Sequence, residues 1–150
     1  MERTTHQFVI FEVNGEIYGL NILIAESIES MYRITRVPKS PPEIVGVINL
    51  RGDIVPIISL RKILGLEDSY TDLTRLIIVR FEDYRLGLIV DRVYDILTVP
   101  QNNIQTNVDV LTDRERIFVS GIINMNDRPI MLMDVPKTLE RINLINGQGV

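Results

Sequence analysis

The two halves of the chain repeat one pattern of strands and turns, and this repeat limits the folds that the chain can adopt. Residues 9–22 and 77–90 each read as a strand, a polar turn and a second strand that ends in Gly-Leu. Aligning Gly19 with Gly87 keeps apolar residues opposite apolar residues through both hairpins. A pattern that recurs with its turns intact indicates two copies of one structural unit.

Two more blocks recur in the same order after these hairpins. They are 46–50 with 121–125, and 57–62 with 132–137. Because all matched blocks keep their order, the sequence predicts a mainly β protein of two similar units, about residues 8–66 and 75–135. The polar stretch 67–74 is the expected junction between them.

Each unit is expected to curl its strands over an interior of its own, because an isolated hairpin is only marginally stable. The runs 76–79 and 86–90 are almost entirely aliphatic. Strands that are apolar on both faces are buried on both faces. The sequence therefore predicts two barrels packed together over a continuous apolar seam.

Short helices are expected at equivalent places in the two repeats. Ser59 can act as the N-cap of a helix over 60–64. Asp134 or Val135 leads into a second helix over 136–143, which starts with a proline in its tolerated first turn.

Composition favours an acidic globular protein. The chain has 150 residues, of which 45% are hydrophobic, and a formal net charge of −4. It can therefore bury a sizeable core, and it lacks the basic excess of a nucleic-acid binder. No cysteine, secretory signal or apolar run long enough for a membrane span is visible. We expect a cytoplasmic protein with flexible ends at 1–7 and 144–150.

Residues that could support catalysis are few. His6 is the one histidine, and it precedes the first expected strand, where nothing would align it with a nucleophile or a metal. Three carboxylate pairs are available: Glu26 with Glu29, Asp91 with Asp95, and Asp53 with Asp134. Glycosidase chemistry would need aromatic platforms beside such a pair, and the chain has no tryptophan. We therefore interpret these acids as exposed turn and strand-end residues, and the function as binding.

Residues 46–60 form the most informative predicted hairpin, because an arginine stands beside its tight turn. Aliphatic runs flank the segment 49–53, which contains Arg51. The guanidinium is planar, always charged and carries donors in fixed directions. It suits either the docking of a partner or an internal ion pair.

Apolar residues also recur three positions apart beside acidic residues. They are Ile22, Ala25 and Ile28 in the first repeat, and Val90, Val93 and Ile96 in the second. Most of them must be core. The aliphatic content exceeds what two small barrels enclose, so part of the set is expected to line a groove that accepts the apolar face of a partner helix.

The repeated blocks resemble the CheW family of chemotaxis coupling proteins over about residues 8–143. The matching motifs are Tyr18-Gly19-Leu20 with Ile22, the segment 45–52 (Val-Gly-Val-Ile-Asn-Leu-Arg-Gly), the segment 54–57 (Ile-Val-Pro-Ile) and the segment 87–93 (Gly-Leu-Ile-Val-Asp-Arg-Val). The resemblance implies a single domain of two SH3-like five-stranded β-barrel subdomains packed together, with short helices that include one near the C-terminus.

The resemblance also implies a function. It points to a non-catalytic adaptor without a cofactor, which couples methyl-accepting chemoreceptors to the regulatory domain of the histidine kinase CheA. Such an adaptor binds no nucleic acid. It is cytoplasmic and reaches the membrane only indirectly, when it is recruited to receptor clusters at the inner face.

Two sets of contact residues follow from the resemblance. The kinase-binding and control set is Val45, Gly46, Asn49, Arg51, Gly52 and Ile54. The set that lines the groove for the helical tip of a receptor is Ile22, Ala25, Leu86 and Val93. Arg51 matches the family arginine tied to kinase control, and an internal salt bridge to Glu26 is an equally good interpretation. Both interpretations of Arg51 can be true at once.

Two positions depart from the family pattern. Ser27 stands where many members have Glu, and Glu26, one position earlier, would point to the opposite face of a strand. The carboxylate partner of Arg51 is therefore open. Ser59 replaces a common Asp, which keeps the N-cap but removes a negative charge from the helix start.

Two alternative functions stay open from the sequence. One is a CheW-like regulatory domain of a larger CheA- or CheV-type protein, although no kinase ATP-binding segment or receiver-like unit is visible. The other, from a different class, is a small-barrel nucleic-acid-binding module. That module would need basic residues interleaved with stacking aromatic side chains, and aromatic residues make up only 6% of this acidic chain.

Overall fold

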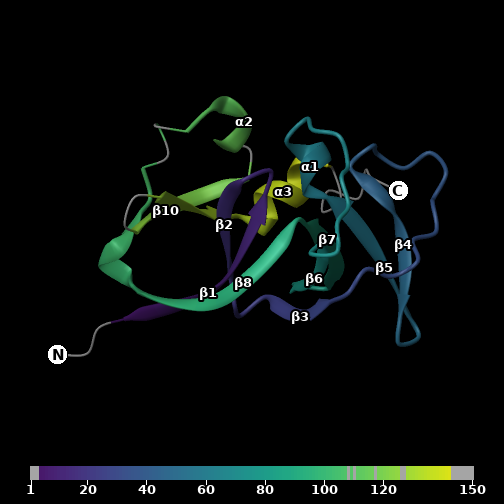
Figure 1. Cartoon of the computed structure of the whole chain (residues 1–150), viewed down its shortest axis with the longest axis horizontal. Helices are drawn as coiled ribbons and strands as arrows, with labels where there is room; N and C mark the ends of the chain where they lie inside the picture. The colour runs from purple at the N-terminus through teal and green to yellow at the C-terminus, as the bar shows by residue number, and fades with distance from the viewer. Residues whose placement is uncertain (1–3, 108, 110, 117, 126–127, 143–150) are drawn as a thin grey trace.

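A computed structural model describes residues 4–107, 109, 111–116, 118–125 and 128–142, which form two β-sheets side by side (Figure 1). The strands are β1 (Thr5–Val13), β2 (Glu16–Asn21), β3 (Ala25–Glu29), β4 (Ile44–Leu50), β5 (Asp53–Ser59), β6 (Arg75–Phe81), β7 (Tyr84–Val90), β8 (Arg92–Pro100), β9 (Ile104–Gln105), β10 (Val119–Met125) and β11 (Arg128–Met133). The helices are α1 (Leu60–Ile63), the 3-10 turn η1 (Gln101–Asn103), α2 (Asp113–Arg116) and α3 (Val135–Arg141).

The two repeats exchange their first hairpins between the sheets. One sheet has the order β3-β6-β7-β5-β4 and the other the order β8-β1-β2-β11-β10-β9. The prediction that residues 8–66 and 75–135 each close a barrel of their own is therefore wrong. Strand pattern identifies a hairpin but not the sheet that it joins. We call β3 to β7 the central unit, and β1, β2 and β8 to β11 the terminal unit.

The repeat itself is visible in the order of the strands. The order β3-β6-β7-β5-β4 corresponds strand by strand to β8-β1-β2-β11-β10, and the short β9 is an extra edge strand. Each unit also contains a close parallel pairing of two strands. In the terminal unit Gly19 lies opposite Leu132, and in the central unit Gly87 lies opposite Ile57. A Cβ atom on Gly19 would lie 3.1 Å from Leu132, and one on Gly87 would lie 2.6 Å from Ile57. The two glycines thus make room for a neighbouring side chain, and the mainly β fold of two packed units is confirmed.

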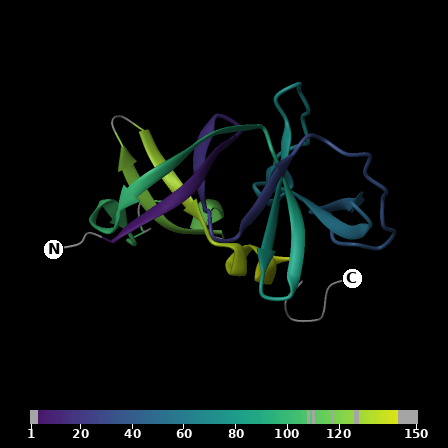
Figure 2. The ribbon, with the colours of Figure 1, turned by 90° about the horizontal axis from the view of Figure 1, so that it is seen from below.

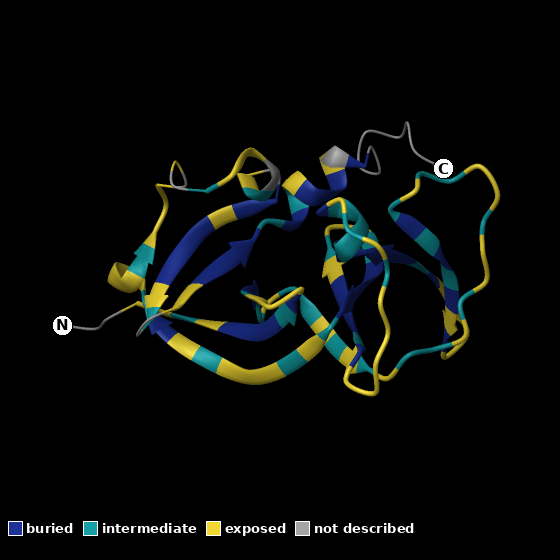
Figure 3. Ribbon diagram, turned by 45° about the horizontal axis from the view of Figure 1, so that its top comes forward, coloured by how far each residue is buried: buried dark blue, intermediate teal, exposed yellow. Residues whose placement is uncertain are grey.

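The core confirms the predicted apolar seam. One buried cluster contains residues of both units, such as Phe11 and Leu88. A second cluster around Ile78 belongs to the central unit, and a third around Ile123 belongs to the terminal unit. Buried residues are concentrated in the strands of both units (Figure 3), and α3 lies where the two units meet (Figure 2). The aliphatic runs are buried on both faces because each sheet covers its own interior and the shared seam.

The predicted N-cap at Ser59 is confirmed, and Asp134, one of the two residues expected to lead into the second helix, is the N-cap of α3. The Ser59 side chain accepts a hydrogen bond from the backbone N–H of Lys62 at 3.2 Å, and Asp134 caps α3 in the same way through Lys137 at 3.0 Å. The Ser59 hydroxyl also donates to the Asp68 carboxylate at 2.5 Å. Asp68 therefore brings a negative charge to the start of α1, where the sequence had indicated that one was lost.

The amino-terminal end differs from its prediction. Thr5, His6 and Gln7 lie in β1, opposite Pro100, Val99 and Thr98 of β8, and not in a flexible end. The His6 ring also contacts the side chain of Gln101. Residues 1–3 and the expected flexible end at 144–150 lie outside the described residues. The described helices are all too short to cross a membrane.

Candidate functional site: the β4–β5 hairpin and the unit junction

The β4–β5 hairpin turns within two residues. Leu50 pairs with Asp53, and the two residues between them, Arg51 and Gly52, have φ angles of 50° and 95°. Positive φ at both central positions is the geometry of a type I′ turn, which prefers Asn-Gly. The Asn49 side chain supports the turn by accepting a hydrogen bond from the N–H of Gly52 at 2.8 Å. Arg51 therefore occupies a backbone conformation that costs free energy for a residue with a Cβ atom.

The tip of this hairpin carries the exposed part of the predicted kinase-binding set. The Arg51 side chain is 63% exposed, and Ile54 is 65% exposed. Val45 is half-buried. Gly46 is buried at a β-bulge, where a Cβ atom would lie only 2.2 Å from the carbonyl oxygen of Thr35. Gly46 thus shapes the strand, whereas Arg51 and Ile54 present their side chains to solvent.

Arg51 pairs with Glu29, not with Glu26 as the sequence suggested. Its Nη2 lies 3.3 Å from Oε2 of Glu29, at the end of β3. Because β3 and β4 are the two edges of the central sheet, this ion pair joins the ends of the curled sheet. The Ser27 hydroxyl, followed by the Arg51 guanidinium, lowers the pKa of Glu29. Glu29 lies two residues beyond Ser27, and that alternation could have identified it from the sequence.

Glu26 is held by a different pair of arginines. Its carboxylate accepts hydrogen bonds from Arg80 at 3.1 Å and from Arg85 at 2.9 Å, and Arg85 also reaches Asp53 at 2.7 Å. Burial alone would raise the pKa of Glu26, but the hydrogen bonds from Arg85 and Arg80 outweigh burial and lower it. This network ties β3 to the first residue of β5.

Two other carboxylates that the sequence offered for catalysis, Asp91 and Asp134, are engaged in structural contacts, whereas Asp95 is exposed. Asp91 forms a bidentate ion pair with Arg61, whose pKa the Asp91 carboxylate raises. Asp134 caps α3. Across the described part of the chain, no three His, Asp or Glu side chains gather as a group that could hold a metal ion.

The predicted receptor residues lie where the chain passes between the units. It crosses from β2 to β3 through Ile22, Leu23 and Ile24, and from β7 to β8 at Asp91. Ile22, Ala25 and Val93 are half-buried, and the last two pack against the shared cluster.

Leu86 differs from the rest of this set, because it is 2% exposed and belongs to the shared cluster. It supports the surface from below and does not form part of it. The sequence did not single out Leu23, which is 87% exposed. Its neighbours Ile22 and Ile24 are also apolar, so the hydrophobic pattern of the sequence does not distinguish Leu23 as an exposed residue.

The fold defines a mainly β protein of two packed barrel-like units. The model of the CheW-like domain matches residues 7–143. The chain is 35% identical over 140 residues to the chemotaxis protein CheW of Bacillus subtilis, covering 93% of this chain and 90% of that protein. It is 33% identical over 138 residues to that of Thermotoga maritima, covering 91% and 89%.

A solved structure is similar as well. The crystal structure of the scaffolding protein TtCheW from Thermoanaerobacter tengcongensis matches with a TM-score of 0.81 at 32% identity, over 87% of this chain and 90% of that chain. The chain therefore belongs to the CheW family of chemotaxis adaptor proteins.

Proposed function

We propose that this chain is a non-catalytic adaptor that couples methyl-accepting chemoreceptors to the histidine kinase CheA. In this role the chain is one functional domain over 8–143, works in the cytoplasm and is recruited to receptor clusters at the inner membrane face. Its membership of the CheW family supports the proposal. Two separate surfaces on one small protein are what a coupling role requires.

The kinase surface is the tip of the β4–β5 hairpin, and Arg51 is the observation that carries the proposal. A permanently charged side chain is kept at a turn position that favours Asn or Gly. Its ion pair with Glu29 is too exposed to be worth more than about 1 kcal/mol. Backbone strain that is not offset by stabilising local contacts is typical of functional sites. Exposed Ile54, close to the same turn, supplies an apolar anchor for the regulatory domain of CheA.

The receptor surface is formed by Ile22, Ala25 and Val93, and the buried Leu86 belongs to the cluster against which Ala25 and Val93 pack. The cytoplasmic tip of a chemoreceptor is a helical hairpin. An amphipathic helix binds by laying its apolar face on such residues. The surface lies beside the connections between the units, whereas the kinase surface lies at the turn of the β4–β5 hairpin.

Two charge-introducing variants test the two surfaces against each other. Ile54→Arg is expected to weaken binding to the isolated regulatory domain of CheA at least tenfold, about 1.4 kcal/mol, and to leave binding to a receptor-tip hairpin within twofold. Ile22→Arg is expected to do the reverse. Leu73→Arg, at a residue 49% exposed between α1 and β6, is the matched control and should change neither affinity. Calorimetric titration of the wild type and the three variants measures the affinity for each partner. Loss of both affinities from either variant, or of neither from both, contradicts the assignment of two separate surfaces.

A further inference from the structure

We propose that Asp91 is a positioning residue that fixes the angle between the central and terminal units, and with it the place of Val93 on the receptor surface. The proposal rests on the receptor contact proposed above. It adds a residue that acts without touching the receptor.

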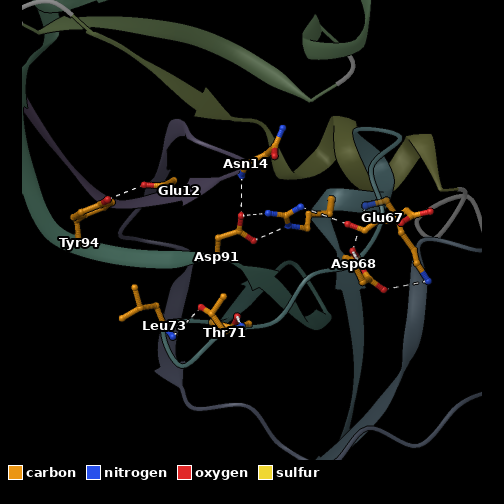
Figure 4. A network of polar contacts seen from close by, with 12 residues as sticks. Glu12, Asn14, Glu67, Asp68, Thr71, Leu73, Asp91 and Tyr94 are labelled. Atoms are coloured by element: carbon orange, nitrogen blue, oxygen red, sulfur yellow. Dashed lines mark hydrogen bonds and ion pairs between the residues drawn. The ribbon is translucent and has the colours of Figure 1, made fainter.

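Asp91 is bound from both units at once (Figure 4). Its Oδ1 accepts from Nε of Arg61 at 2.9 Å, and its Oδ2 accepts from Nη2 of Arg61 at 2.6 Å. Arg61 lies in α1, directly after β5 of the central unit. The second oxygen also accepts from the backbone N–H of Asn14 at 2.8 Å, in the β1–β2 turn of the terminal unit. The N–H of Asp91 itself donates to the carbonyl of Glu12 at 2.9 Å.

Because Asp91 connects the two units, the bonds that hold it also affect how the units are oriented relative to each other. Asp91 is the one residue between β7 of the central unit and β8 of the terminal unit. Val93 follows two residues later. The direction in which the chain leaves Asp91 therefore sets where β8 begins and where the Val93 side chain lies.

Packing on this side of the seam is incomplete beside Asn14, the residue whose backbone N–H binds Asp91. A cavity of about 190 Å³ lies between the units, lined by Asn14 and Tyr18 on one side and by Leu64 and Leu66 on the other. The shared apolar cluster holds the units together, but hydrophobic attraction is non-directional. A bidentate guanidinium–carboxylate pair fixes both distance and orientation. Its two side chains are only 19% and 18% exposed, so solvent screens it less than the pairs at the hairpin.

The same helix offers a control pair. Lys62, next to Arg61, pairs with Asp68 at 3.3 Å. Both residues belong to the central unit, so this pair cannot set the angle between units. Lys62→Met therefore removes an ion pair from α1 without touching the link across the seam.

The experiment compares the wild type with Asp91→Asn, Arg61→Lys and Lys62→Met in the full chain. Asp91→Asn keeps the shape and an acceptor for Asn14 but removes the charge. Arg61→Lys keeps the charge but loses the planar fork, and it serves as the second variant if Asp91→Asn does not fold. Residual dipolar couplings measure the angle between units, and titrations measure binding to a receptor-tip hairpin and to the regulatory domain of CheA.

In the wild type and Lys62→Met, the couplings of both units should fit a single alignment tensor at the angle seen here. In Asp91→Asn and, to a smaller extent, in Arg61→Lys, the couplings should fit only when the angle between the units is changed. Receptor-hairpin binding should weaken about tenfold in Asp91→Asn while binding to the regulatory domain stays within twofold.

An unchanged angle in Asp91→Asn overturns the inference, and so does a changed angle with unchanged receptor binding. If the wild type itself does not bind the hairpin, the proposed function fails, and the dipolar couplings still decide whether Asp91 sets the angle.

Discussion

Replacing Arg51 with Asn separates the structural role of this residue from its proposed role in kinase docking, because the turn prefers asparagine at this position. Arg51 has φ of 50° and is followed by Gly52 at φ of 95°. Asn-Gly is the preferred pair for such a type I′ turn. Arg51→Asn therefore relieves backbone strain and, at the same time, removes the guanidinium.

The expected change in stability follows from two opposing contributions. Losing the ion pair with Glu29 costs about 0.2–1 kcal/mol, because the Arg51 side chain is 63% exposed. Relieving the left-handed conformation gains about 1 kcal/mol. The free energy of unfolding should thus stay within about 1 kcal/mol of the wild type, or rise. Arg51→Ala loses the ion pair and keeps the strain, so it should be the less stable of the two variants.

Urea unfolding followed by circular dichroism measures the stabilities, since the chain has no tryptophan. Titration with the regulatory domain of CheA measures the docking role, and we expect Arg51→Asn to weaken binding at least tenfold. A destabilisation of more than about 2 kcal/mol would show that the ion pair is mainly structural. Unchanged affinity in a stable Arg51→Asn variant would refute the docking role of the guanidinium.

Three further changes test how the fold is held. Gly87→Ala should destabilise the chain by about 1–3 kcal/mol in urea, because the new Cβ atom would lie 2.6 Å from Ile57. Ser59→Ala should cost about 0.5–2 kcal/mol through loss of the N-cap of α1. Glu26 has a lowered pKa in the folded state, so its ionised form stabilises the fold above about pH 4.5, and this contribution is lost as the pH falls through the folded-state pKa. The stability difference between the wild type and Glu26→Gln should accordingly shrink between pH 6 and pH 3.

Each of these has a clear contrary result. A Gly87→Ala variant as stable as the wild type would mean that Ile57 moves aside without cost. An unaffected Ser59→Ala variant would show that Asp68 or solvent replaces the cap. A pH-independent difference between the wild type and Glu26→Gln would mean that the bonds to the two arginines do not depend on the charge of Glu26.

Repeat and hydrophobic pattern predict much of this fold. Gly19 and Gly87 recur because both sheets need the same close parallel approach, and Ser59 and Asp134 recur because both helices need a cap. The hairpin exchange could not be predicted in this way. A hairpin reports its local pairing, whereas the sheet that it joins depends on contacts between residues far apart in the sequence.

The site residues show the same division between local and non-local information. The turn at Arg51 and Gly52 follows from local sequence and lies where it was expected. The partner of Arg51 depends on how the central sheet curls, which brings Glu29 and not Glu26 to the hairpin. The aliphatic pattern likewise does not distinguish Leu86, which is buried, from Leu23, which is exposed.

The coupling role is tested most directly by sedimenting receptor-containing membranes with CheA in the presence and absence of this chain, and by measuring the kinase activity of the pellet. The proposed function predicts that the wild-type chain brings CheA into the pellet and raises its activity, and that Arg51→Asn does neither to the same extent. CheA that sediments equally well without the chain, or a chain that stays in the supernatant, would contradict the adaptor function.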